Sequence, residues 1–213
     1  MPARVLIAIV SQICRDGLRK ALSSWAAIEV VADTGDGRSA VSLAAELRPD
    51  LAIVESVLPG LGGVEVTRHL VAEHPGMQVI VISMDADREL IGRAMRAGAS
   101  GFVLAEGGLA ELQRAIGDVL EGKTYLSPSA EAAVIASLGE PTSEPFGTLT
   151  SREREVLQLL AEGNSTKKIA DVLCVSAKTV ETHRRHVMRK LGIHSVAGLT
   201  KFAIRHALTS VND

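Results

Sequence analysis

The sequence predicts two domains, an α/β domain followed by an all-α domain, and two observations support this fold class. Up to about residue 126, short stretches that are apolar at every position alternate with helical patterns, as in parallel sheets whose strands are buried on both faces. From residue 149 onward only helical patterns occur, and each has a capping residue before it. We therefore expect a doubly wound (βα)5 sheet and a bundle of four helices.

Five short apolar stretches mark the predicted strands. Glycine or proline punctuates the joints between these stretches and the helical patterns. In sheets of this kind the chemistry lies at the carboxyl ends of the strands, so the residues that follow each stretch are the first candidates for a site. The stretches are Val5–Val10, Ile28–Val31, Leu51–Val54, Val79–Ile82 and Phe102–Leu104.

The charge of the chain is divided unevenly. Residues 1–148 carry 12 basic and 19 acidic side chains, a net of −7, whereas residues 149–213 carry 11 basic and 6 acidic ones, a net of +5. An acidic body joined to a basic end points toward nucleic acid. No stretch approaches the roughly 20 apolar residues of a membrane span. The apolar start is too short for a signal peptide, and Cys14 and Cys174 suggest no disulfide framework, so we expect a cytoplasmic protein.

Residues 127–148 are predicted to link the two domains. Ser127-Pro128 begins a short helical patch that ends near Leu138, and the stretch 139–147 has two prolines and no periodicity. The expected boundaries are therefore 1–126 for the first domain and 149–213 for the second.

The predicted helices of the second domain begin and end at recognisable residues. Thr150 and Glu153 form a capping box before the first helix. Two further helices, joined by Cys174-Val175-Ser176, fit a helix-turn-helix. The other expected N-caps are Ser165, Ser176 and Ser195, and the expected terminating glycines are Gly163 and Gly192.

The helix over residues 177–191 has one apolar face and one basic face. Val180 and Val187 lie on the apolar stripe, and a helix of this kind can lie in a major groove. On this face, Arg185 can contact a guanine edge and Thr182 a base or a thymine methyl, with the other side chains nearer to phosphates. On charge alone a solvated basic face is the better interpretation, but the cap, the turn and the stripe together favour DNA. The candidate contacts are Lys178, Thr179, Glu181, Thr182, Arg184, Arg185 and Arg189.

Residues 149–208 resemble the LuxR-type helix-turn-helix. The resemblance implies a four-helix DNA-binding domain whose third helix enters the major groove. It also implies that the last helix, through Val196, Leu199 and Ala203, pairs two copies of the chain on an inverted repeat. The motifs that carry it are 149–157, Ala161-Glu-Gly163, Ile169-Ala170, 176–183 and Arg189-Lys-Leu-Gly192.

The first 126 residues resemble the receiver domain of NarL/FixJ-family response regulators. The resemblance implies an aspartate that accepts a phosphoryl group, an acid pair that holds a divalent metal, and a hydroxyl and a lysine that grip the phosphoryl oxygens. The motifs that carry it include Arg15-Asp-Gly-Leu18, Leu47-Arg-Pro-Asp50, 96–102 and Tyr125-Leu-Ser-Pro128.

The functional positions of that family hold other residues here. The acid pair falls on Ile9 and Val10, the acceptor on Glu55 and the lysine on Ala105, while the hydroxyl at Ser83 and the aromatic switch position at Phe102 change only mildly. Magnesium requires hard oxygen ligands, and without a metal the charge of a transferring phosphoryl group is not neutralised. We expect neither a metal nor another cofactor.

Glu55 could instead mimic a phosphorylated aspartate. Mimicry needs a lysine to attract, and Ala105 supplies no cation. We therefore favour a Glu55 carboxylate that lies in water at the mouth of a loop, near Ser83 or Asp85, because a buried unpaired carboxylate is costly.

Together these observations predict a sequence-specific regulator of transcription that binds double-stranded promoter DNA as a homodimer, independently of receiver phosphorylation. RNA polymerase or another regulator is a further candidate partner, and neither a membrane nor an enzymatic activity is expected. Two alternatives stay open. One is a regulator phosphorylated at another residue, such as Asp50 or Asp85. The other is a protein-interaction module, in which the degenerate receiver binds a partner or a small ligand that controls DNA binding.

Overall fold

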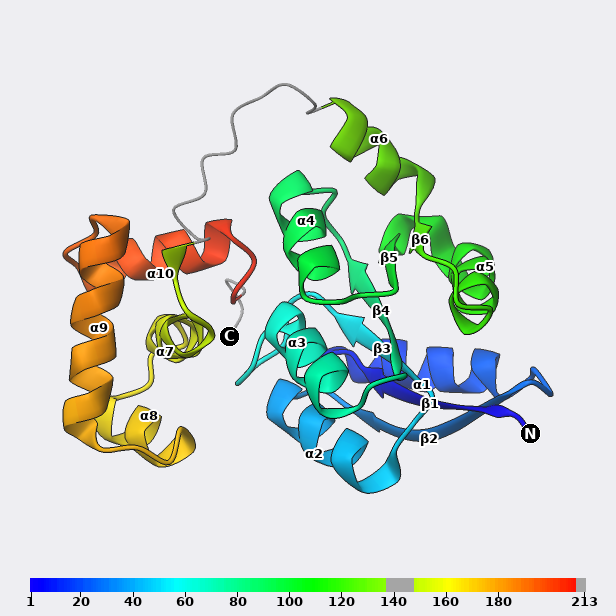
Figure 1. Ribbon diagram of the computed structural model, residues 1–213, viewed down its shortest axis with the longest axis horizontal. Coiled ribbons are helices and arrows are strands. Elements are labelled where there is room, and N and C mark those ends of the chain that lie inside the picture. Colours follow the sequence, from blue (N-terminus) through cyan, green and yellow to red (C-terminus); the bar gives the residue numbers. More distant parts are fainter. Residues whose placement is uncertain (137–147, 210–213) are drawn as a thin grey trace. The chain divides into compact units, whose positions relative to one another are not determined.

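The chain divides into two compact units, Met1–Glu140 and Pro141–Asp213. The computed structural model describes residues 1–136 and 148–209. The first unit is an α/β domain and the second is all-α, as Figure 1 shows. Within these two described ranges, no helix has both the length and the apolarity to cross a membrane.

A parallel sheet forms the centre of the first unit, with the strand order β2-β1-β3-β4-β5-β6. Five of its strands fall where the apolar stretches predict them, which confirms the doubly wound fold. The sixth, β6, was not expected, because two residues are too short to show a periodicity. The strands are β1 (Ala3–Ala8), β2 (Ile28–Thr34), β3 (Leu51–Glu55), β4 (Gln78–Ser83), β5 (Gly101–Leu104) and β6 (Tyr125–Leu126).

Helices cover both faces of this sheet. Helices α1 (Gln12–Leu22) and α5 (Gly108–Leu120) lie on one face (Figure 1). The other face carries α2 (Gly37–Leu47), α3 (Gly63–Glu73) and α4 (Arg88–Arg96). Alternate residues of a strand point to opposite faces of the sheet. Because helices cover both faces, every position of a central strand is buried. In β1 the side chains from Val5 to Ala8 are all fully buried, which explains the continuous apolar stretches.

Helix α6 (Pro128–Ala136) belongs to the first unit. It contacts α4 and β5, and Ala130 is fully buried. The sequence assigned this helix to the linker because its composition changes there, but its packing moves the boundary toward the C-terminus. The remainder of the expected linker, residues 137–147, lies outside the described residues.

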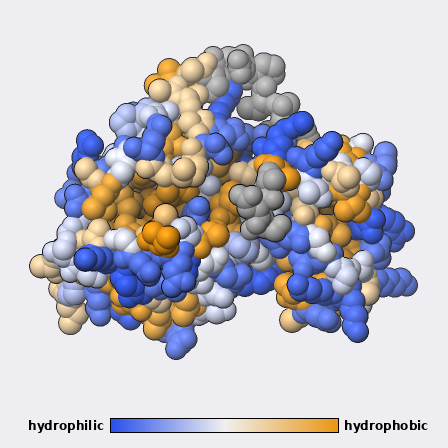
Figure 2. All heavy atoms as spheres, turned by 180° about the vertical axis from the view of Figure 1, so that it is seen from behind, coloured by the Kyte–Doolittle hydropathy of each residue, from blue (hydrophilic) through white to orange (hydrophobic). Residues whose placement is uncertain are grey.

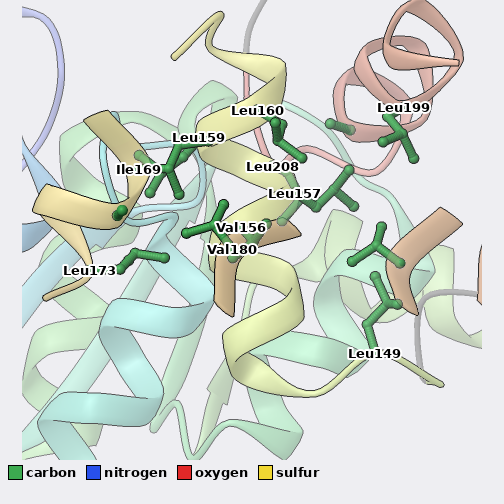
Figure 3. Packing of buried hydrophobic residues seen from close by; sticks show 13 residues of the cluster. Leu149, Val156, Leu157, Leu159, Leu160, Ile169, Leu173, Val180, Leu199 and Leu208 are labelled. Atoms are coloured by element: carbon green, nitrogen blue, oxygen red, sulfur yellow. The ribbon is translucent and has the colours of Figure 1, made fainter. Parts of the chain in front are cut away.

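Within residues 148–209 the second unit has four helices: α7 (Ser151–Ala161), α8 (Thr166–Val172), α9 (Ala177–Leu191) and α10 (Val196–Arg205). Figure 3 shows their apolar side chains, among them Val156, Ile169 and Leu199, meeting in one core. The expected caps are confirmed. The side chain of Thr150 accepts from the Glu153 amide while Glu153 accepts from the Thr150 amide, and Ser165, Ser176 and Ser195 cap the next three helices.

Candidate functional site

The carboxyl edge of the sheet brings the degenerate receiver positions together. Strand register pairs Ala8 with Val54, so that Ile9 and Glu55 follow on neighbouring strands. It also pairs Ser83 with Leu104, which places Ala105 beside the end of β4. Ile9, Glu55, Ser83 and Ala105 all line one pocket at this edge, whereas Val10 does not.

The Glu55 carboxylate is half-buried and turned toward the chain that follows β1. Its Oε2 accepts a hydrogen bond of 2.7 Å from the backbone amide of Val10. Desolvation by burial raises the pKa of Glu55, and the hydrogen bond from Val10 opposes that shift. The carboxylate therefore lies partly out of water, held at the pocket wall by the Val10 amide, and it shares the pocket with Ser83, one of its two expected neighbours.

The hydroxyl of Ser83 is occupied by neighbouring groups. Ser83 is 2% exposed. Its Oγ lies 3.2 Å from the Ser56 hydroxyl, which donates to it, and 3.1 Å from the Asp85 amide, which also donates. Asp85 therefore contacts the Ser83 hydroxyl through its own backbone amide and not through its carboxylate.

The lining of the pocket has no cationic side chain and no acidic side chain other than Glu55. Ala105 is exposed, and neither a lysine nor an arginine is among the lining residues. Ile9 and Val10 have no side-chain oxygen, although magnesium prefers oxygen ligands. The described part of the chain contains no group of three or more histidine, cysteine or acidic side chains placed to bind a metal.

Arg15 holds the loop that follows β1, a role that the sequence did not reveal. Its Nη1 donates to the carbonyl oxygens of Ile9 and Val10 at 2.6 Å and 2.7 Å. Its Nε forms an ion pair of 3.2 Å with Asp33, which Arg19 also contacts. Because Arg15 comes from α1 and Asp33 from β2, this cluster could be recognised only from the fold. It fixes the backbone that carries Ile9 and the amide that binds Glu55.

Helix α9 presents a basic face opposite its buried stripe. Val180 and Val187 are fully buried. Lys178, Arg185 and Arg189 are exposed, and none of the three forms an ion pair within the described residues. These cations are therefore available to an anionic partner.

The other candidate contacts of α9 also interact inside the second unit. Glu181 accepts a hydrogen bond of 2.8 Å from the Thr166 hydroxyl of α8 and lies 3.8 Å from Arg184. The Thr182 hydroxyl donates to the carbonyl oxygen of Lys178 at 2.9 Å. The hydroxyl of Thr179 lies 2.8 Å from that of Ser176. Glu181 thus ties α9 to α8 and fixes the angle between the two helices.

Helix α10 requires a correction to the expected pairing surface. Leu199 and Ala203 are fully buried in the core of the second unit, where α10 packs against α7. They face the interior because α10 completes this small core. Val196, which is 41% exposed, is the member of the expected set that faces solvent.

Two family models match the chain. The response regulator receiver domain matches residues 5–117, and the luxR family of bacterial regulatory proteins matches residues 147–203. The receiver match spans more than half of the chain.

The chain belongs to the LuxR-type response regulators. This membership confirms the resemblance of the first 126 residues to a receiver domain and of residues 149–208 to the LuxR-type helix-turn-helix. Members of this family are transcription regulators that bind DNA rather than enzymes, so these coarser predictions are also confirmed.

Several relatives of this response regulator have known names or structures. Response regulator GacA of Pseudomonas aeruginosa is 32% identical over 96% of this chain and 97% of its own length. The oxygen regulatory protein NreC of Staphylococcus aureus is 32% identical over 96% of this chain and 98% of its own. RcsB of Salmonella enterica serovar Typhimurium, solved on a promoter with the phosphomimetic BeF3−, is 25% identical, with a TM-score of 0.61 and coverage of 95% and 98%.

Proposed function

We propose that this response regulator controls transcription from specific promoter sequences as a cytoplasmic homodimer, and that phosphorylation of its first unit is not the switch. The observation that carries the proposal is the set of residues at the carboxyl edge of the sheet. Ile9, Val10 and Ala105 stand where the receiver family has its acid pair and its lysine, and Glu55 stands at the acceptor position. RNA polymerase or another regulator would be a further partner of the DNA-bound dimer.

The physical argument rests on charge. A phosphoryl group in transfer must have its charge neutralised by a metal or by cations, and no cationic side chain lines this pocket. Among the alternative acceptors, Asp50 comes directly before β3, whereas Glu55 is the last residue of that strand, so the two lie at opposite ends of β3. The Asp50 carboxylate accepts a hydrogen bond of 2.8 Å from the backbone amide of Arg4. Asp85 lies on the pocket side of the sheet, but it has no lysine beside it in the lining.

The exposed cations of α9 support recognition of DNA. A recognition helix in the major groove contacts base edges with some side chains of its exposed face and phosphates with others. Arg185 is suited to the bidentate contact with guanine, while Lys178 and Arg189 are suited to phosphates. Dimerisation through the exposed face of α10, which includes Val196, would match the symmetry of an inverted repeat.

The test is to select genomic DNA fragments with the full-length, unphosphorylated protein and to measure the affinity for the best fragment. We expect Arg185→Ala to weaken this binding by about 1–3 kcal/mol, because a bidentate base contact is lost. Arg114→Ala is the matched control, since Arg114 is an exposed arginine on α5 of the first unit. Its affinity should stay close to that of the unchanged protein.

Two results would contradict the proposal. Equal binding to all fragments at moderate salt would show that the protein does not discriminate sequence. Specific binding that appears only after treatment with a small phosphodonor would show that phosphorylation is the switch after all.

A second candidate function is favoured by the pocket itself. A first unit that has lost its phosphoryl-binding groups but keeps a pocket could bind a partner or a small ligand that controls DNA binding. Under this alternative the purified protein alone would select no fragment, and a component of the cell extract would restore selection.

A further inference from the structure

The pocket at the carboxyl edge of the sheet is large enough for a small molecule. Its volume is about 330 Å³, at the lower end of the roughly 300–1,000 Å³ that ligand pockets typically have. It opens between α1, the ends of β3, β4 and β5, and the start of α5. All of its lining residues belong to the first unit.

Aliphatic side chains form most of the pocket wall. Ile9 and Ala105 belong to this wall at the positions where the receiver family has an acid and a lysine. A charged receiver site is filled by water, metal and phosphate, whereas an apolar hollow holds water poorly. Occupation by apolar surface is therefore favourable here. The wall also includes the larger aliphatic side chains of Leu18, Ile82, Leu104 and Leu112.

The mouth of the pocket is apolar as well. Met84 is 80% exposed and Leu109 is 42% exposed, and both line the pocket. Val10 and Ile13, which are 42% and 85% exposed, flank lining residues in the sequence. Figure 2 shows apolar side chains gathered on the part of the first unit that carries α1 and α5. Clustered exposure of large apolar side chains is typical of a binding surface rather than of a plain solvated one.

Glu55 offers a side-chain hydrogen-bond acceptor at the pocket wall. Glu55 Oε2 is taken by the Val10 amide, and the other carboxylate oxygen has no hydrogen bond or ion pair with any described residue. The Ser83 hydroxyl is engaged by Ser56 and Asp85. A ligand would therefore meet a carboxylate oxygen that can only accept while Glu55 is ionised.

The wall is held in place before any ligand arrives. Arg15 ties the carbonyl oxygens of Ile9 and Val10 to Asp33, and Ile9 is itself 8% exposed and packed in the core. A pocket that is already formed loses less conformational freedom when it binds a ligand.

From these observations we infer that the pocket binds a compact, mainly apolar small molecule that carries one hydrogen-bond donor, a hydroxyl or an amine, directed at Glu55. The inference goes beyond the proposed function and does not depend on it, because binding can be measured without DNA.

The test uses the full-length protein and N-phenyl-1-naphthylamine, an uncharged apolar probe with a single N–H whose emission rises in apolar surroundings. We expect a saturable rise in emission at one probe per chain. Gly17→Leu should weaken binding at least ten-fold. Gly17 lies on α1 and lines the pocket, and a Cβ there meets no atom within 4 Å, so a leucine can enter the hollow without displacing the backbone.

Gly117→Leu is the matched control. Gly117 lies on α5, a Cβ there also meets no atom within 4 Å, and it is not among the lining residues. Leucine has a higher helix propensity than glycine, so both variants should fold. Absence of saturable binding, or an equal loss of affinity in Gly17→Leu and Gly117→Leu, would overturn the inference.

The donor is tested with the N-methylated form of the same probe, which has no N–H. The unchanged protein should prefer the N–H form several-fold, and Glu55→Gln should reduce that preference, because a glutamine that gives its oxygen to the Val10 amide presents a donor to the ligand. Equal affinity for the two probes in the unchanged protein would overturn the assignment of a donor directed at Glu55.

Discussion

Glu55 shows how the surroundings of one side chain set its chemistry. It ends β3 and lies at a pocket wall that is mostly aliphatic. The Val10 amide stabilises its charged form, but desolvation outweighs this contribution and raises its pKa. An acid with a raised pKa holds its proton more tightly in the folded state than in the unfolded state, so its ionisation above that pKa opposes folding.

This shift leads to a prediction about stability and pH. Glu55→Gln removes the ionisation but keeps an oxygen for the Val10 amide, so the variant should be more stable than the unchanged protein at neutral pH. The difference should shrink as the pH falls from neutral toward the ordinary carboxyl pKa of 4.5, because the native Glu55 then takes up its proton. Urea unfolding of both proteins across this pH range measures the effect.

The control for this experiment is Glu46→Gln, an exposed carboxylate on α2. It should change the free energy of unfolding little at either end of the range, as surface substitutions do. If Glu55→Gln were less stable than the unchanged protein at neutral pH, the Val10 hydrogen bond would outweigh desolvation and the argument would fail.

Helix α10 illustrates how an element can serve the core and the surface at once. Its inner side, with Leu199 and Ala203, completes the core of the second unit, and its outer side includes Val196. A short helical domain has few buried residues, so each inner position contributes much of the stability. The dimerisation proposed above would therefore use the outer side of α10.

The two sides of α10 should respond differently to truncation. Leu199→Ala should lower the free energy of unfolding of the second unit by about 2–5 kcal/mol, because it leaves a cavity in the core. Val196→Ala should change that free energy by only about 0.5 kcal/mol or less and should instead weaken cooperative binding to paired half-sites. Urea unfolding and titration of one-site and two-site DNA separate the two effects. An unchanged unfolding free energy in Leu199→Ala would contradict the packing of α10.

The whole molecule joins an acidic unit to a basic one. Residues 1–148 carry a net charge of −7 and residues 149–213 a net of +5. The basic unit is suited to the phosphate backbone of DNA, whose charge dominates affinity. The acidic unit, under the function proposed above, does not receive a phosphoryl signal.

The full-length protein is therefore expected to gain no phosphoryl group from a small phosphodonor in the presence of magnesium, as measured by intact mass. The variant that combines Ile9→Asp, Val10→Asp, Glu55→Asp and Ala105→Lys is the informative comparison, because it supplies oxygen ligands and a cation. A mass increase in the unchanged protein, mapped to Asp50 or Asp85, would instead favour phosphorylation at another residue.

The strands and most helix boundaries could be predicted from the sequence because their signals are local. A strand buried on both faces must be apolar at each position, as 5–8 are. The N-caps at Thr150, Ser165, Ser176 and Ser195 act on amides within the next few residues. The two-residue β6 and the packing of α6 against α4 and β5 lack such signals, because they depend on what lies beside them in space.

The sequence by itself determined that this chain is an α/β domain with a helix-turn-helix domain, and its resemblance to receiver domains predicted that Ile9, Val10 and Ala105 replace charged residues. Only the tertiary structure decided that Ile9 and Ala105 line an apolar pocket, that Glu55 binds the Val10 amide, and that Leu199 is buried. The sequence states the identity of each residue directly, whereas the enclosure of a pocket and the burial of a side chain arise only when segments distant in sequence pack together.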